Sequence, residues 1–228
     1  MNTTPPPTKT GSRNAESISS RLDEIRDQVR AMIANGTLKP GERVNEQALA
    51  VQLGVGRNSA REALRLLERS GLVRITPNRG AEVCKITLEE ALDLYDVRAG
   101  LAQAAGRLVA SRLAAVEEAT LLALVHDMGQ AVAQRDGARY TDLNTTFHKQ
   151  LMAATRNSRL IDVNARIEDE LSLYLHKGVY TVAQMQGSLS EHERIVDAVR
   201  NGRIAEAAEA FESHVLNGKR RMLDTVSR

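Results

Sequence analysis

The chain has 228 residues, 42% of them hydrophobic and 26% charged, a composition typical of a folded globular protein with a substantial core. No stretch approaches the roughly 20 apolar residues that a membrane-spanning helix needs, and the N-terminus lacks the apolar run of a signal peptide. Because there is only one cysteine, an internal disulfide is excluded, and we expect a cytoplasmic protein that does not bind membranes.

The net charge of +2 is unevenly distributed along the chain. Residues 1–85 contain 14 Lys and Arg against 9 Asp and Glu, whereas the remainder contains 17 against 20. A basic first part followed by an acidic second part predicts a domain that binds a polyanion, joined to a domain with another role. Residues 1–16 are polar and contain a run of prolines, so we expect them to form a disordered tail.

Residues 21–34 repeat hydrophobic side chains at helical spacing and are followed by an Asn-Gly pair, so they predict a first helix. A second helix is predicted over residues 45–52, with an asparagine N-cap, and a third over residues 57–70, closed by a glycine. Residues 73–83 alternate hydrophobic and polar side chains on either side of a Thr-Pro-Asn-Arg-Gly turn, the pattern of a β-hairpin. Three helices followed by a hairpin predict a winged helix-turn-helix domain over residues 17–86, whose third helix would enter the major groove of DNA.

The third predicted helix carries arginines at four-residue intervals, which places them on one face, while its opposite face offers side chains suited to a core. On an isolated helix such a row is more often a solvated charged surface. In a winged helix-turn-helix, however, an arginine near the start of this helix can bond guanine or grip phosphate. We therefore predict that the row contacts DNA, together with Arg79 at the tip of the hairpin. The arginines are Arg57, Arg61, Arg65 and Arg69, and the core positions are Ala60, Ala63, Leu64 and Leu67.

The segment "LKPGERVNEQALAVQLGVGRNSAREALRLLERSGLV" resembles the DNA-binding domain of GntR-family transcription regulators, and the likeness extends from about Arg21 to Val83. Carried over position by position, the resemblance implies DNA contacts by Arg57 and Arg61 on the recognition helix and by Gly80 at the tip of the wing. We add neighbouring polar positions as further candidate DNA contacts: Asn58, Arg65 and Arg79.

Two positions depart from the pattern of that family. Gly56 stands where Ser or Thr is usual, so the hydroxyl that can bind phosphate is missing, although glycine still serves as an N-cap. Ser59 stands where proline is usual, which is a milder change.

The chain beyond residue 86 follows a helical period, and the sequence Thr-Leu-Glu-Glu at residues 87–90 is a capping box that starts its first helix. A second capping box, at residues 190–193, is expected to start a later helix. The fold class is therefore mainly α, with the winged helix-turn-helix followed by an all-α bundle of six or seven helices over residues 87–228. Breaks between helices are predicted near Gly137, Asn157, Gly187 and Gly202.

Three histidines, His148, His192 and His214, fall on inward-facing positions of three different predicted helices, and Asn144 precedes the first by one turn. Three imidazoles and one oxygen ligand from converging helices would suit a metal ion. Spacing alone leaves open the alternative that each histidine is a hydrogen-bonded core or surface residue. We keep that interpretation for the other two histidines, His126 and His176.

The segments "YDVRAGL", "NTTFHKQL" and "EHERIVDAVRNGRIAEAAEAFESH" resemble the FCD effector domain of the FadR subgroup of GntR regulators, over about residues 88–220. Its metal-binding members hold a divalent ion with an Asp, a His four residues later and two further His. The resemblance thus implies the ligands Asn144, His148, His192 and His214, with a neutral and weaker amide in place of the Asp. We expect Zn²⁺, with Ni²⁺ or Mn²⁺ as alternatives. A second departure is Ala102, where the family commonly has Glu.

These features predict a transcription regulator, most simply a repressor, that binds double-stranded operator DNA. We expect a homodimer, because one winged helix contacts only a few base pairs and two-fold proteins match two-fold sites. Neutral ligands leave the charge of the metal uncompensated, so a small carboxylate metabolite is the expected effector, with Arg98 clamping it from the other side. We expect no catalytic residues and no enzymatic activity.

Two other functions stay open at this point. A metal-dependent hydrolase would use the same histidines, but it normally needs a carboxylate or histidine base, and no H-E-x-x-H or paired-carboxylate pattern accompanies them. An unregulated architectural DNA-binding protein would leave the helical bundle and its polar interior cluster without a role.

Overall fold

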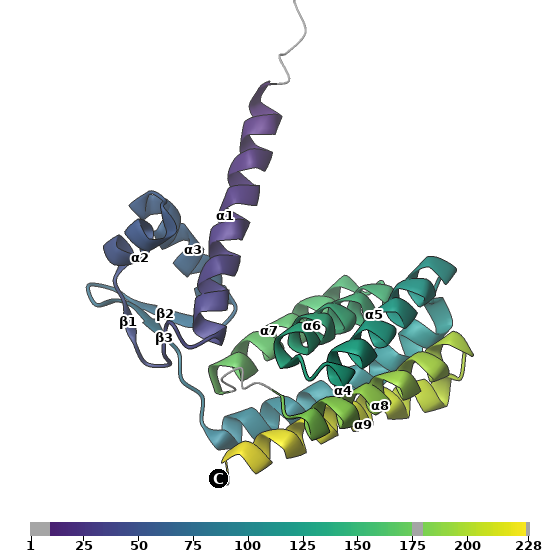
Figure 1. Ribbon diagram of the computed structural model, residues 1–228. Helices are drawn as coiled ribbons and strands as arrows, with labels where there is room; N and C mark the ends of the chain where they lie inside the picture. Colours follow the sequence, from purple (N-terminus) through teal and green to yellow (C-terminus); the bar gives the residue numbers. More distant parts are fainter. Residues whose placement is uncertain (1–9, 175–179, 227–228) are drawn as a thin grey trace, which may run out of the picture. The chain divides into compact units, whose positions relative to one another are not determined.

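The computed structural model describes residues 10–174 and 180–226 (Figure 1). The chain divides into two compact units, one formed mainly by residues up to Lys85 and the other mainly by residues from Ile86 onward. His176 and residues 1–9 of the expected disordered tail lie outside the described residues. The first helix already begins at Thr10, so the tail predicted to reach residue 16 is too long. Residues 10–16 contain no proline to prevent the helix from extending toward the N-terminus.

The described part of the N-terminal unit contains three helices and a small antiparallel sheet with strand order β1-β3-β2, which confirms the predicted winged helix-turn-helix. Strand β1 pairs with β3 and was not predicted, because two residues are too few to show an alternating pattern. The elements are α1 (Thr10–Ala34), β1 (Arg43–Val44), α2 (Glu46–Leu53), α3 (Arg57–Arg69), β2 (Val73–Thr76) and β3 (Gly80–Val83).

The turn between α2 and α3 follows from local sequence. The side chain of Asn45 accepts hydrogen bonds from the backbone N–H groups of Gln47 and Ala48, which caps the start of α2 as predicted. Gly54 ends α2 with a φ of 64°, a left-handed conformation that favours glycine. The short turn brings α3 back against α1 and α2, as a helix-turn-helix requires.

The predicted core face of α3 is buried, with its four side chains 0% exposed. Burial of these side chains stabilises one orientation of α3 about its own axis. The face that carries the arginines is therefore left on the outside. The buried residues are Ala60, Ala63, Leu64 and Leu67.

The C-terminal unit is an all-α bundle with six helices in its described part, in agreement with the predicted six or seven. In Figure 1, α4 lies beside α9, and Gly106 explains how closely they approach. A Cβ atom at Gly106 would lie only 2.6 Å from the carbonyl oxygen of Ala207, so glycine is required there. The helices are α4 (Leu88–Arg112), α5 (Ala115–Ala133), α6 (Gly137–Ala154), α7 (Ser158–Tyr174), α8 (Val182–Arg200) and α9 (Ile204–Val226).

Helix α8 starts earlier than the sequence pattern predicted. The helix begins at Val182 rather than at Ser190, and its capping box is formed by Thr181 and Gln184. The break predicted at Gly187 is wrong, because the helix continues through it and buries Met185 on its inner face. A Ser-x-x-Glu pattern caps a helix only where the chain enters it, and here the preceding turn already supplies the carbonyl acceptors.

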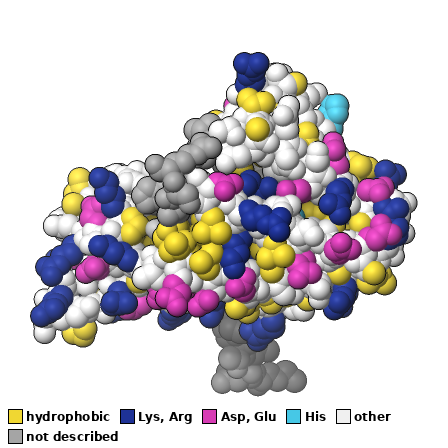
Figure 2. Space-filling model, turned by 90° about the horizontal axis from the view of Figure 1, so that it is seen from below, with side chains coloured by type: hydrophobic (Ala, Val, Ile, Leu, Met, Phe, Trp, Pro, Cys, Tyr) yellow, Lys and Arg dark blue, Asp and Glu magenta, His cyan; other side chains and the backbone are white. Residues whose placement is uncertain are grey.

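The described surface carries interspersed acidic and basic side chains, as the face in Figure 2 shows, with scattered hydrophobic groups among them. Several of these charges form ion pairs between helices, for example Lys219 of α9 with Asp96 of α4 at 2.5 Å. Among the described helices, none is both long and apolar enough to cross a membrane.

Candidate metal centre and DNA-binding surface

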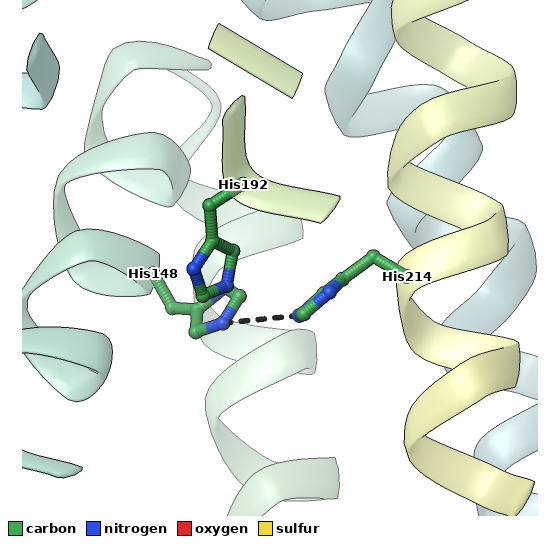
Figure 3. A group of neighbouring side chains, drawn as sticks. All are labelled: His148, His192 and His214. Atoms are coloured by element: carbon green, nitrogen blue, oxygen red, sulfur yellow. Dashed lines mark hydrogen bonds between the residues drawn. The ribbon is translucent and has the colours of Figure 1, made fainter. Parts of the chain in front are cut away.

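Three histidines from three helices converge in the interior of the bundle (Figure 3). His148 comes from α6, His192 from α8 and His214 from α9, and one nitrogen of each lies within 4.8 Å of the others. His148 Nε2 and His214 Nε2 lie 3.2 Å apart. The structure thus brings together the three histidines that the sequence singled out, although His192 lies deep within α8 and not in its first turn as predicted. His126, by contrast, is exposed and, among the described residues, bonds Gln130 of its own helix.

Burial favours the neutral form of the three imidazoles. It lowers the pKa of His148 and of His192 well below the usual range, because a charged ring would lose its hydration, and the neighbouring His214 adds repulsion. Burial also lowers the pKa of His214, although Glu191 partly opposes this effect. A neutral imidazole has a free nitrogen lone pair, which is the form of histidine that binds a metal ion.

His192 of this cluster, and Asn144 one turn before His148 on α6, carry buried polar atoms without a partner in the described part of the chain. Both ring nitrogens of His192 and the Oδ1 atom of Asn144 make no hydrogen bond there, and His192 is 0% exposed. A buried polar atom without a partner costs free energy, on the order of 1–3 kcal/mol. A divalent ion would satisfy such atoms, so three imidazole nitrogens and one amide oxygen fit a metal centre.

Glu191 orients His214 and was missed in the sequence analysis. Its Oε2 atom lies 2.6 Å from His214 Nδ1, and the carboxylate also accepts hydrogen bonds from Arg221 and Asn217. Burial alone would raise the pKa of Glu191, but the bonds from His214 and Arg221 prevail and lower it to about 2. The carboxylate therefore stays charged and holds the proton of His214 on Nδ1, which leaves Nε2 facing His148.

A cavity beside the histidines is lined by residues of α4, α6, α7, α8 and α9. Arg98 lines it, as the sequence analysis expected for an effector clamp, but its Nη2 atom already donates to Glu168 Oε1 at 2.7 Å. Asn164, one turn before Glu168 on α7, lines it as well. Ala102 adds only a methyl group where the family commonly has Glu, and most of the remaining lining is aliphatic or aromatic.

On the N-terminal unit, Arg57 and Arg61 lie on the outer face of α3 and share one carboxylate. Glu46 accepts from Arg61 Nη2 at 2.9 Å and from Arg57 Nε at 3.4 Å. The hydrogen bond from Arg61 is the main cause that lowers the pKa of Glu46, against the effect of burial. Arg57 is the freer arginine, with 59% of its side chain exposed against 40% for Arg61. Nothing in the sequence pattern pointed to Glu46.

The remaining candidate DNA contacts all lie on the surface of the same unit. Asn58 is exposed in the first turn of α3, and Arg65 is exposed but paired with Glu62 at 2.6 Å. Gly56 provides no side-chain cap, so no hydroxyl stands at the N-cap position of α3. Arg79 and Gly80 are exposed at the turn of the β2–β3 hairpin, where Gly80 has a φ of 82°.

Comparison with known proteins gives matches over both units. A model described as bacterial regulatory proteins of the gntR family matches residues 22–83, and a model described as FCD domain matches residues 93–217. An "Uncharacterized HTH-type transcriptional regulator YdhC" of Bacillus subtilis (strain 168) is 32% identical over 83% of this chain and 84% of its own. The "HTH-type transcriptional repressor GlaR" of Escherichia coli (strain K12) is 25% identical over 81% of this chain and 87% of its own. The solved structure of E. coli McbR/YncC, at 17% identity, has the same fold, with a TM-score of 0.80 over 90% of this chain and 98% of that one.

Burial of the imidazoles makes the stability of the chelator-treated protein depend on pH. Since the pKa of His192 is lower in the folded state than its ordinary 6.5, the unfolded chain takes up a proton first as the pH falls below about 6.5. We expect the free energy of unfolding to be fully present above that pH. Below it, the free energy should fall by up to about 1.4 kcal/mol per pH unit for each such histidine. Urea unfolding between pH 7.5 and 5 should show a shallower slope for His192→Gln than for wild type. Equal slopes would contradict the prediction, and His126→Gln, at an exposed position, is the control that should keep the wild-type slope.

Proposed function

Because the chain belongs to the gntR family of bacterial regulatory proteins and carries an FCD domain, it is a DNA-binding transcription regulator, and we propose that it is a homodimeric repressor of the FadR subgroup controlled by a small carboxylate. In this proposal, residues 17–86 bind operator DNA and residues 87–228 bind the effector and form the dimer. The observation that carries the proposed control is the convergence of His148, His192 and His214 beside a cavity.

Two alternative functions, a metal-dependent hydrolase and an unregulated architectural protein, were left open by the sequence. The matching families and named relatives are transcriptional regulators, so the protein is not an enzyme and the hydrolase is set aside. An unregulated architectural protein is disfavoured by the buried atoms of His192 and Asn144, which have no partner among the described residues. Such atoms are costly in a domain that serves only as a scaffold.

We assign DNA contacts to the outer face of α3 and to the wing. Arg57 stands at the first position of α3, where a recognition helix approaches the bases, and only one contact of 3.4 Å holds it to Glu46. It is our candidate for guanine recognition. Arg61 is bound more firmly and suits a fixed contact to a base or phosphate. Phosphate contacts are assigned to the other candidates: Asn58, Arg65, Arg79 and Gly80.

The first test is a gel-shift assay on the DNA upstream of the protein's own gene. Arg57→Ala should weaken specific binding by about 1–3 kcal/mol and relax the preference at one base pair, whereas loss of a phosphate contact should weaken binding evenly across sequences. Arg61→Ala should also weaken binding. Arg159→Ala, which removes an exposed positive charge from α7, is the control and should bind like wild type. The assignment fails if Arg57→Ala and Arg61→Ala both bind like wild type at physiological salt.

A homodimer would place two winged helices on a short pseudo-palindrome. With a single cysteine in the chain, we expect the helical domain to form the contact without a disulfide. Sedimentation of the full-length protein at operator-binding concentrations should give twice the mass of one chain, under reducing and non-reducing conditions alike. A monomer at those concentrations would exclude the dimer.

The residues that would hold the metal are His148, His192 and His214, with Asn144 as a weaker fourth ligand. Three nitrogens and one oxygen suit Zn²⁺ best, with Ni²⁺ and Mn²⁺ as alternatives. When bound, the ion would supply a positive charge that an anionic effector could neutralise, because none of the four ligands is charged. Arg98, on the wall of the same cavity, would pair with the effector's carboxylate.

Loss of the carboxylate behind His214 should weaken metal binding. We expect Glu191→Gln to reduce the affinity for Zn²⁺ by about 10- to 100-fold, because His214 loses the partner that fixes its proton and its orientation. Asn144→Asp should increase the affinity by adding a negative ligand. Competition titration against a chromophoric chelator measures both effects, and Glu193→Gln, an exposed position two residues along α8, should behave like wild type. A wild-type protein that binds no divalent ion in this titration would refute the metal site.

A further inference from the structure

The positive charge expected to hold the effector already has a negative partner in the cavity. Arg98 of α4 and Glu168 of α7 form an ion pair at 2.7 Å, with 20% and 41% of their side chains exposed. Both residues line the cavity beside His148 and His214. A carboxylate that binds Arg98 therefore comes to lie close to the negative charge of Glu168.

Arg98 nevertheless keeps a donor for a ligand. A guanidinium group has five N–H donors, and the Nη2 bond to Glu168 uses only one of its three nitrogens. The Nε atom is buried and makes no hydrogen bond within the described residues. The N–H on Nε is thus a donor that a ligand carboxylate could satisfy while the bond to Glu168 stays in place.

The wall formed by α7 offers acceptors. Asn164 and Glu168 lie one turn apart on α7, both line the cavity, and Asn164 is only 8% exposed. A carboxylate has no donor and at least four lone-pair positions, of which Arg98 uses one. The cavity therefore presents a cationic donor from α4 and an anionic acceptor from α7, next to each other.

We infer that the effector is a zwitterion, a carboxylate that also carries an ammonium group, and that Glu168 is the residue that selects it. The ligand carboxylate pairs with Arg98 and the ligand ammonium pairs with Glu168, so that opposite charges alternate around the cavity. A second carboxylate in place of the ammonium would face Glu168 and be repelled. This inference rests on the proposed function, since it requires that the cavity binds a carboxylate.

A purely structural role of Glu168 makes a different prediction. If Glu168 only held Arg98 in position, its removal would change the binding of every carboxylate by a similar factor, because the contact with Arg98 is common to them all. If Glu168 selects the ammonium group, its removal changes the order of affinities between ligands. The ratio of two dissociation constants separates these roles, because general changes in the cavity cancel in it.

The experiment is calorimetric titration of the full-length protein, as purified without chelator, with butanoate, 4-aminobutanoate and succinate. These three probes share one carboxylate and differ in a methyl, an ammonium or a second carboxylate at the far end. The corresponding three-carbon set, propanoate, 3-aminopropanoate and malonate, covers a shorter distance between the groups. For at least one length, the wild type should bind the amino compound about tenfold or more tightly than the dicarboxylate.

Glu168→Gln should bring that ratio close to one or reverse it, because the amide has the same size but no charge. Glu170→Gln, two residues along the same helix and outside the cavity lining, should keep the wild-type ratio. A wild type that prefers the dicarboxylate at both lengths, or a Glu168→Gln ratio equal to that of wild type, overturns the inference and leaves the proposed function intact. If no probe of either set binds, the proposed carboxylate effector itself fails, and this inference fails with it.

Discussion

The exclusion of water from the centre of the helical bundle is the constraint on which the candidate effector site depends. His148, His192 and His214 come from helices that are distant in sequence, and each is brought to the same place by the burial of its helix. Phe147 illustrates this, because it is fully buried beside His148 on α6 and its ring packs 4.5 Å from that of His192. The same packing that places the imidazoles also keeps them neutral, so geometry and protonation have one cause.

Several arginines expected to act on a ligand are each held by a glutamate. Arg57 and Arg61 share Glu46, and Arg98 pairs with Glu168. Such partners limit the rotamers of long side chains before a ligand arrives, which lowers the entropy lost on binding. They also prevent like charges from repelling one another in the free protein. The acidic residues are therefore part of both binding surfaces, although a negative charge repels the phosphates of DNA and the carboxylate of an effector.

The sequence predicted periodic and capped features well. The core face of α3, the turn at Gly54, the hairpin and the capping box at Thr87 all have local signals, and the three histidines were found because they occupy inward positions of separate helices. The start of α8 was misplaced because a capping-box pattern also occurs inside helices, where nothing local marks it as inactive. Strand β1 was missed because it forms only by pairing with β3, far along the chain.

The residues of the site that escaped prediction share a physical reason. Glu46 lies 15 positions from Arg61, Glu168 lies 70 from Arg98 and Glu191 lies 23 from His214, so each contact is set by tertiary packing. A lone glutamate on a helix has the same local signal whether it faces solvent or a buried partner. Spacing and the resemblance to a family pointed to the arginines and histidines but not to the acidic residues that hold them.

The close contact between Gly106 and Ala207 has a consequence for how this protein can evolve. Arg98 precedes Gly106 on α4 by about two turns, and His214 follows Ala207 on α9 by about two turns, so the contact fixes the distance between one wall of the cavity and one of the converging imidazoles. Any side chain larger than hydrogen at position 106 would push the two helices apart and displace both at once. Substitution of Gly106 is therefore not tolerated, although this residue touches neither DNA nor ligand. Positions on the cavity wall such as Ala102 bear no such restriction, and new effector preferences can arise there while the helix spacing is inherited unchanged.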